Sequence, residues 1–304
     1  MSAGRGVAGR RRAAVELAPQ RGPQPAAAAG ANAVLAAGRR FRNILTVLRF
    51  AAATGFADFG TMFTWRSWTI GWLSRVLCQV TFFALIGRLL GAPEAVRYLL
   101  IGNAVLIAVL ESAFVVASTT WERRAGTLPL LIAAPTSPVL VFCGRSVQWI
   151  ASGTASASVA LFVLSPLFGV ALPMPQALVA VPLIGLVSLS AYCLGLVLAG
   201  LVLRVMQLRN VVGNVTWMVI ALLAGVQVPV TFWPAWVQAA SAVLPARNGL
   251  AGIRALLDGD GVGAVCSAAG LEALVAVGWL AVAGLIFRHL AEQGRRDGSI
   301  EFVD

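Results

Sequence analysis

Long apolar runs that carry almost no charge restrict the fold of this chain more than any other feature of its sequence. Each of six segments contains about 20 or more mainly apolar residues, enough for a helix to cross the roughly 30 Å core of a bilayer. The segments are residues 68–87, 98–119, 146–170, 176–203, 211–230 and 263–287. Because the runs are continuous and do not alternate with polar residues, they predict an all-α polytopic membrane protein with six transmembrane helices.

The overall composition agrees with a membrane protein. Apolar residues make up 59% of the 304 residues and charged residues 12%, whereas soluble domains carry about 25% charged residues. The chain therefore lacks the polar surface that a soluble enzyme of this length needs. Its four cysteines are scattered and its one histidine is His289, so neither a metal site nor a bound cofactor is expected in this chain.

The distribution of arginine predicts the orientation in the membrane. All 23 basic residues are Arg, and the formal net charge is +11. The chain ends and the two loops on their side, 120–145 and 204–210, hold 18 of these residues, whereas the opposite loops hold 4. Because basic residues accumulate on the cytoplasmic side, both termini are expected in the cytoplasm.

Four parts of the chain are expected around these spans. Residues 1–38 are rich in Ala, Gly, Pro and Arg and are predicted to form a disordered basic tail, for which contact with anionic lipid is favoured over nucleic acid. Residues 39–67 show apolar and Arg positions at helical spacing, which indicates an amphipathic interfacial helix leading into the membrane. Residues 68–290 would form the six-span domain, and residues 291–304 a cytoplasmic C-terminal tail.

The loop between the second and third spans contains the pattern of a short apolar helix. Gly126 can interrupt regular structure after a charged turn, and Thr127 can cap the N-terminus of a new helix. Pro135 would end that helix. The charged turn consists of Glu122, Arg123 and Arg124, and the apolar positions include Leu128 and Leu131. An apolar helix outside the bilayer must bury its face against the spans or against a partner subunit.

Two stretches of the sequence resemble the type 2 integral-membrane permeases of ATP-binding-cassette (ABC) transporters, a mostly export-type family. The family pattern E-x-x-x-G-T-L-x-x-L-x-x-x-P between spans two and three is matched by Glu122, Gly126, Thr127, Leu128, Leu131 and Pro135. A second pattern after span five, a Trp followed by Leu-Pro and a later Arg, is matched by Trp236, Leu244, Pro245 and Arg254. Pro129 departs from the family, in which an acidic residue often follows G-T-L.

The resemblance implies a transport function that depends on partner chains. In the family, the stretch between spans two and three is a coupling helix that docks into an ATPase subunit. This chain has no Lys and therefore no G-x-x-x-x-G-K-[ST] phosphate loop. ATP and magnesium would thus be bound by a separate ATPase, present as two copies or as a pair, and a second permease copy or a related permease would complete the pathway.

The resemblance also implies a location and a class of cargo. The chain would be a multi-pass protein of the bacterial cytoplasmic (inner) membrane, in contact with membrane lipid. Its spans carry few fixed charges, which favours a lipophilic or lipid-linked compound, such as a drug, an antibiotic or an envelope component.

Three charges inside the predicted spans need partners, because a charged side chain at the bilayer centre costs about 2.5–3.5 kcal/mol on insertion scales. Arg75 and Glu111 would lie at similar depths on consecutive spans, so they are expected to pair, with snorkelling of Arg75 to the head groups as the alternative. Glu272 could meet Arg247 or Arg254 if the external segment dips inward, or it could face a substrate cavity or carry a proton.

The segment between the fifth and sixth spans, residues 231–262, is too polar and too often broken by Pro to cross the membrane. It is predicted to form one or two short re-entrant or external helices. Within the fifth span, the polar residues Asn214 and Thr216, together with Trp217, are candidates to line a pathway or to form hydrogen bonds between helices.

Two other classes of function remain open on the sequence alone. A membrane-embedded enzyme would need clustered acids, a His or a nucleophile with its base, and the intramembrane acids Glu111 and Glu272 lie on different spans. An ATP-independent secondary transporter could use the same two acids, but it would usually contain internal repeats, and none is convincing here.

Overall fold

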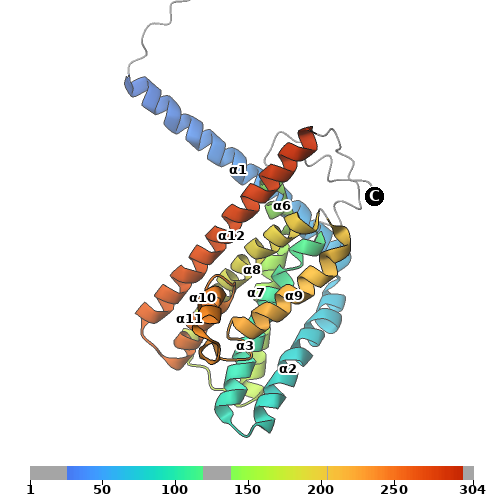
Figure 1. Cartoon of the computed structure of the whole chain (residues 1–304), viewed down its shortest axis with the longest axis vertical. Helices are drawn as coiled ribbons and strands as arrows, with labels where there is room; N and C mark the ends of the chain where they lie inside the picture. The colour runs from blue at the N-terminus through green and yellow to red at the C-terminus, as the bar shows by residue number, and fades with distance from the viewer. Residues whose placement is uncertain (1–25, 119–137, 204, 297–304) are drawn as a thin grey trace, which may run out of the picture. The chain divides into compact units, whose positions relative to one another are not determined.

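The computed structural model describes residues 26–118, 138–203 and 205–296, and over these ranges the chain is helical, with no strand (Figure 1). The all-α class predicted from the sequence is therefore confirmed. The longer helices are α1 (Ala26–Met62), α2 (Ser74–Leu89), α3 (Pro93–Ser112), α6 (Pro138–Ser146), α7 (Gln148–Leu167), α8 (Ala180–Val202), α9 (Arg209–Leu223) and α12 (Val262–Arg296). The shorter ones are η1 (Ser67–Leu73), η2 (Gln176–Val179), η3 (Met206–Leu208), η4 (Val230–Phe232), α10 (Ala235–Ser241) and α11 (Arg247–Asp258).

Five helices of the described chain are long and apolar enough to cross a membrane. They are Ser67–Leu89, Pro93–Ser118, Leu140–Leu167, Gln176–Val202 and Val262–Leu290, and they coincide with five of the six predicted spans. This is the architecture of a multi-pass membrane protein. The predicted fifth span, 211–230, instead contains the shorter apolar helix Asn210–Leu223, so the count of six spans stays a prediction.

The fifth segment is short because the backbone turns at Gly225. This residue has a left-handed φ of 81°, a conformation that ends a helix and that glycine adopts without steric cost. Hydropathy alone extends the apolar run to Val230, because Val226, Val228 and Val230 are apolar whatever the direction of the backbone.

Helix α3 lies at the centre of the bundle and α12 at its edge. Helix α3 packs on α2, α7 and α8, whereas α12 packs mainly on α8 and α11. In an 18-residue apolar stretch of the span Pro93–Ser118, which contains α3, 83% is buried inside the protein. The corresponding share for the span Val262–Leu290 of α12 is 22%. Gly153 of α7 faces the carbonyl oxygen of Ala108, and a Cβ there would lie only 3.0 Å from that oxygen. The small residue thus allows α7 to approach α3 closely.

The described parts of two helices extend past predicted segment boundaries. Helix α1 is described from Ala26 onward, so it includes residues before the predicted boundary at residue 38; this stretch is rich in alanine, the residue with the highest helix propensity. Helix α12 is described as far as Arg296, past the predicted boundary at residue 290. The chain divides into two compact units, Met1–Ile44 and Leu45–Asp304, and the site described below belongs to the second.

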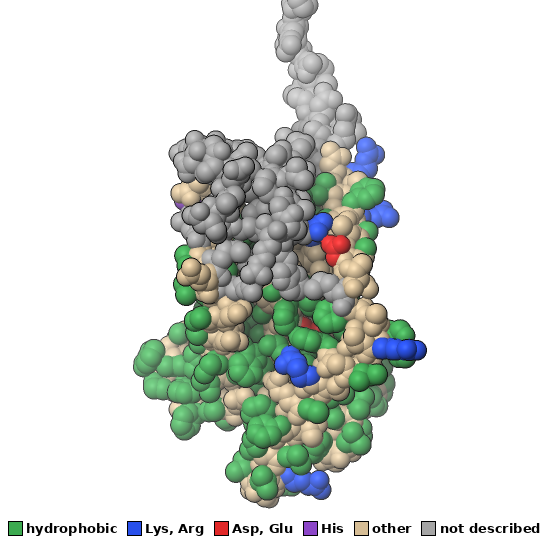
Figure 2. All heavy atoms as spheres, turned by 90° about the vertical axis from the view of Figure 1, so that its right-hand side faces the viewer, with side chains coloured by type: hydrophobic (Ala, Val, Ile, Leu, Met, Phe, Trp, Pro, Cys, Tyr) green, Lys and Arg blue, Asp and Glu red, His purple; other side chains and the backbone are tan. Residues whose placement is uncertain are grey.

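Exposed apolar side chains cover much of the second unit. Figure 2 shows one face on which the described side chains are mostly apolar and only a few are charged. Large exposed apolar residues occur on several helices, for example Phe82 on α2, Met218 on α9, and Leu274 and Leu285 on α12. Such a surface suits contact with lipid tails.

Candidate functional site

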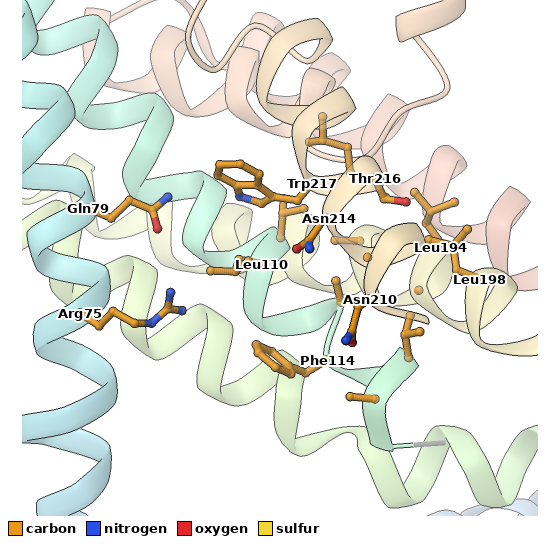
Figure 3. Close-up of a pocket in the computed structure, with 18 residues that line it drawn as sticks. Arg75, Gln79, Leu110, Phe114, Leu194, Leu198, Asn210, Asn214, Thr216 and Trp217 are labelled. Carbon is orange, nitrogen blue, oxygen red and sulfur yellow. The ribbon is translucent and has the colours of Figure 1, made fainter. Parts of the chain in front are cut away.

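A pocket of about 550 Å³ lies between α2, α3, α8 and α9 (Figure 3). This size is within the range of ligand-binding pockets in proteins. Its wall is largely apolar, with Leu110 and Phe114 from the α3 region and Leu194 and Leu198 from α8. Its polar side chains come from the two flanking helices: Arg75 and Gln79 from α2, and Asn210, Asn214 and Thr216 from α9.

The three candidate pathway residues of the fifth segment, Asn214, Thr216 and Trp217, all line this pocket. Asn210, Asn214 and Trp217 are spaced at i, i+4 and i+7, so they share one face of α9. Sequence reasoning missed Gln79. Its i, i+4 spacing from Arg75 places both side chains on one face of α2 and could have indicated a shared polar face.

Two hydrogen-bond donors at the pocket have no partner in the described structure. The Nε2 atom of Gln79 and the Nε1 atom of Trp217 are buried and form no hydrogen bond. In Figure 3 the Gln79 amide and the Trp217 indole point toward one another across the pocket. Buried donors without partners are unfavourable, and a bound group that presents acceptor atoms would satisfy them.

The predicted ion pair between Arg75 and Glu111 is absent as a direct contact of the described residues, although the arginine attracts the carboxylate electrostatically. The guanidinium carbon of Arg75 lies 4.6 Å from the centroid of the Trp72 ring, and no ion pair of the described residues includes Arg75. The indole Nε1 of Trp72 donates a hydrogen bond of 2.8 Å to Glu111. Trp72 thus contacts the guanidinium through its ring face and the carboxylate through its N–H group.

Glu111 is completely buried and is bound by side chains only. The hydroxyl of Ser152 on α7 donates to one of its carboxylate oxygens, and Trp72 of η1 donates to the other. Glu111 therefore joins three helical segments beside the pocket without lining it. The hydrogen bonds to this carboxylate come from neutral donors, and Arg75 adds an electrostatic attraction without a direct contact.

Glu272 of α12 is also completely buried, and it binds the start of α11. The backbone N–H groups of Ala246 and Gly249 donate to its two oxygens, both at 2.9 Å, and Ser190 of α8 donates as well. Of the alternatives for Glu272, a contact with Arg247 or Arg254 is not observed, because both guanidinium groups donate to carbonyl oxygens. The segment does reach Glu272, but it does so with backbone amides, because a helix N-terminus offers free N–H groups and a positive dipole end.

Basic residues bind the other parts of α11. At its C-terminal end, Arg97 of α3 donates to the carbonyl oxygen of Leu257 at 2.7 Å and pairs with Asp258 at 2.7 Å. An anion therefore lies at the start of α11 and a cation at its end, which is the arrangement that the helix dipole favours.

Arg254 connects α11 to the turn after α9. Its two Nη atoms donate to the carbonyl oxygens of Gly225 at 2.8 Å and Tyr98 at 3.2 Å. The guanidinium lies over the Tyr98 ring, 3.6 Å from the centroid. Burial lowers the pKa of Arg254, while the contact with Tyr98 raises it, and an arginine stays charged near neutral pH. Arg254 is thus a positioning residue within the protein.

The remaining candidate residues are placed only in part. Trp236 of α10 is exposed and Pro245 is buried just before α11. The predicted coupling residues lie outside the described residues: Glu122, Arg123, Arg124, Gly126, Thr127, Leu128, Leu131 and Pro135. No group of three or more His, Cys, Asp or Glu residues that could hold a metal ion occurs in the described ranges.

Comparison with known proteins identifies one family. A family model described as "ABC-2 type transporter" matches residues 58–257. The match covers well over half of the chain and includes all the residues that line the pocket between α2, α3, α8 and α9. Helix α12, with Glu272, lies beyond it. No curated protein matches the chain.

Proposed function

Because the chain belongs to the ABC-2 type transporter family, we propose that it is the transmembrane permease subunit of an ABC exporter. It moves a lipophilic or lipid-linked compound, such as a drug, an antibiotic or an envelope component, across the bacterial cytoplasmic membrane. Members of this family are the membrane components of transporters and are not enzymes in themselves. The energy comes from a separate ATPase subunit, which binds ATP and magnesium.

The observation that supports this proposal most directly is the family match across a bundle that contains the pocket. A transported compound needs a cavity inside the membrane part of the protein. The mostly apolar wall, with polar groups on two helices, suits a molecule that has a large apolar part. A cavity bounded by separate helices also changes shape when those helices move relative to one another.

The proposal includes specific partners and an orientation. Residues 122–135 dock as a coupling helix into the ATPase, which is present as two copies or as a pair. A second copy of this chain, or a related permease, completes the pathway, and both termini lie in the cytoplasm. The exposed apolar residues of α2, α9 and α12 contact lipid or the second permease.

A membrane-embedded enzyme or a proton-coupled secondary transporter is supported less well. Glu111 and Glu272 are the buried acids that such a protein would use, and each is held by hydrogen bonds from two or three donors. Neither lines the pocket between α2, α3, α8 and α9. Proton transfer to a substrate there would require these bonds to break first.

Affinity purification of the tagged full-length chain from its native membrane tests the proposal. An ATPase subunit is expected to co-purify in mild detergent and to show vanadate-sensitive ATP hydrolysis. Leu128→Asp or Leu131→Asp is expected to release that subunit, because a charge on the apolar face opposes docking. Leu131→Ile is the matched control and should retain it. Recovery of the chain without any ATPase would contradict the proposal.

A further inference from the structure

We infer that the pocket between α2, α3, α8 and α9 binds the anionic group of a lipophilic molecule through Arg75, Gln79 and Trp217. As a statement about transported cargo, this inference rests on the proposed transport function. As a statement about a binding site, it rests on the donors that the pocket presents and on the charges around it.

The first argument is that the buried polar atoms without partners at this pocket are donors. The Gln79 Nε2 and Trp217 Nε1 atoms are both buried without a hydrogen bond, and both residues line the pocket. An indole N–H can only donate. A ligand that satisfies both groups must present acceptor atoms, and an anionic group such as phosphate or carboxylate offers several together.

The second argument is the charge of the pocket. Arg75 lines it, and its guanidinium forms no ion pair in the described structure but lies against the ring face of Trp72. No Asp or Glu occurs among the residues that line the pocket. The nearby Glu111 carboxylate accepts hydrogen bonds from Trp72 and Ser152 and attracts Arg75, but it does not line the pocket. An anion entering the pocket therefore meets one cation and two neutral donors.

The third argument is the apolar part of the wall. Leu110 and Phe114 lie on one side and Leu194 and Leu198 on another (Figure 3). These side chains offer an apolar surface to the tail of the same ligand, and burial of such a tail away from water is favourable. The combination selects an amphiphile with an anionic head over a cationic one.

Binding of two amphiphiles with the same tail tests this inference. The full-length chain, with its ATPase when one co-purifies, is placed in nanodiscs of phosphatidylcholine. Dissociation constants are measured for dodecyl phosphate and for dodecyltrimethylammonium, and the signal of empty nanodiscs is subtracted. Dodecyl phosphate is expected to bind at least about tenfold more tightly, since only the anion can form charge-assisted hydrogen bonds with Arg75.

Three variants test which side chains of the protein bind dodecyl phosphate. Arg75→Gln is expected to weaken dodecyl phosphate binding about tenfold or more. Trp217→Phe keeps the ring but removes the N–H donor, and it is expected to weaken binding about threefold to tenfold. Arg66→Gln is the matched control: Arg66 also lies near a tryptophan, Trp65, but it does not line the pocket. It should change binding less than about twofold.

The anionic ligand could be a membrane lipid or a transported compound, and two further measurements distinguish them. Competition by phosphatidylglycerol added to the nanodiscs, lost in Arg75→Gln, identifies a resident lipid. Stimulation of ATP hydrolysis by dodecyl phosphate in the wild-type complex, but not in Arg75→Gln, identifies transported cargo. Either result supports an anion site in this pocket.

Other results overturn the inference. Equal binding of the two amphiphiles, or equal losses in Arg75→Gln and Arg66→Gln, would mean that the pocket does not select anions. Trp217→Phe serves as the second test if Arg75→Gln does not elute as the wild type does in size exclusion. A chain that co-purifies with an ATPase but shows no Arg75-dependent binding refutes this inference alone. Arg75-dependent binding without any ATPase refutes the proposed function alone.

Discussion

Glu111 and Glu272 are both completely buried acids on membrane-type helices, yet their surroundings differ. Glu272 accepts hydrogen bonds from the backbone N–H groups of Ala246 and Gly249 and from a serine. Glu111 accepts only from side chains, those of Trp72 and Ser152. One carboxylate therefore fixes the start of a short helix, and the other orients side chains beside a pocket.

At both sites the hydrogen-bond donors to the buried acid are neutral groups. The arginines considered as their partners make direct contacts elsewhere, although Arg75 still attracts the Glu111 carboxylate electrostatically. Arg254 binds carbonyl oxygens and the Tyr98 ring, and Arg75 binds the Trp72 ring. Backbone donors hold their position through the fold, whereas side-chain donors can rotate, so the two sites should respond differently to substitution.

Removal of the Glu272 carboxylate should have the largest effect on stability. Glu272→Ala leaves two backbone N–H groups and a hydroxyl buried without an acceptor, and each costs about 1–3 kcal/mol. The free energy of unfolding should fall by about 3 kcal/mol or more, measured by unfolding in mixed detergent micelles. Glu292→Ala, an exposed acid on the same helix, is the control and should cause little change.

Removal of the Glu111 carboxylate should have a smaller effect. Trp72 and Ser152 can turn toward other acceptors, so Glu111→Ala should lower the free energy of unfolding by about 1–2 kcal/mol. A double-mutant cycle with Trp72→Phe measures how much of this loss comes from the hydrogen bond between the indole N–H group and the carboxylate. Losses at Glu111 as large as those at Glu272 would contradict the distinction between backbone and side-chain donors.

Replacement of Arg254 by lysine tests whether the position of α11, the helix whose start binds Glu272, depends on the geometry of the guanidinium group. Lys keeps the positive charge but cannot form the two-pronged contact with the Gly225 and Tyr98 carbonyl oxygens. Arg254→Lys should lower the free energy of unfolding by about 1 kcal/mol. It should also speed hydrogen exchange in α11, whereas α7, beside Glu111, should exchange at its wild-type rate.

An exposed ion pair should have the smallest effect on the free energy of unfolding. Asp58 of α1 and Arg145 of α6 lie 3.0 Å apart, and the Asp58 side chain is 54% exposed. Asp58→Asn should change the free energy of unfolding by less than about 1 kcal/mol, because solvent screens exposed pairs. An effect larger than that of Glu111→Ala would reverse the order of these two and show that the α1–α6 ion pair contributes more to stability than the Glu111 carboxylate.

The sequence by itself determined the class of the protein and the place of most of its helices. Apolar runs long enough to cross a bilayer indicate spans whatever their neighbours are, because lipid requires apolar side chains and internally bonded backbone. Five of the six predicted spans are helices of the expected length. The resemblance to ABC permeases, based on two short motifs, is confirmed by the match over residues 58–257.

Only the tertiary structure decided the partners of the buried charges and the end of α9. Arg254 and Tyr98, far apart along the chain, bind the carbonyl oxygen of Gly225, where the backbone turns. Glu272 finds its donors in the first turn of α11, through backbone groups that are the same in every residue except proline. Side-chain patterns cannot reveal such contacts, because they depend on how helices rotate and approach one another once the whole bundle has formed.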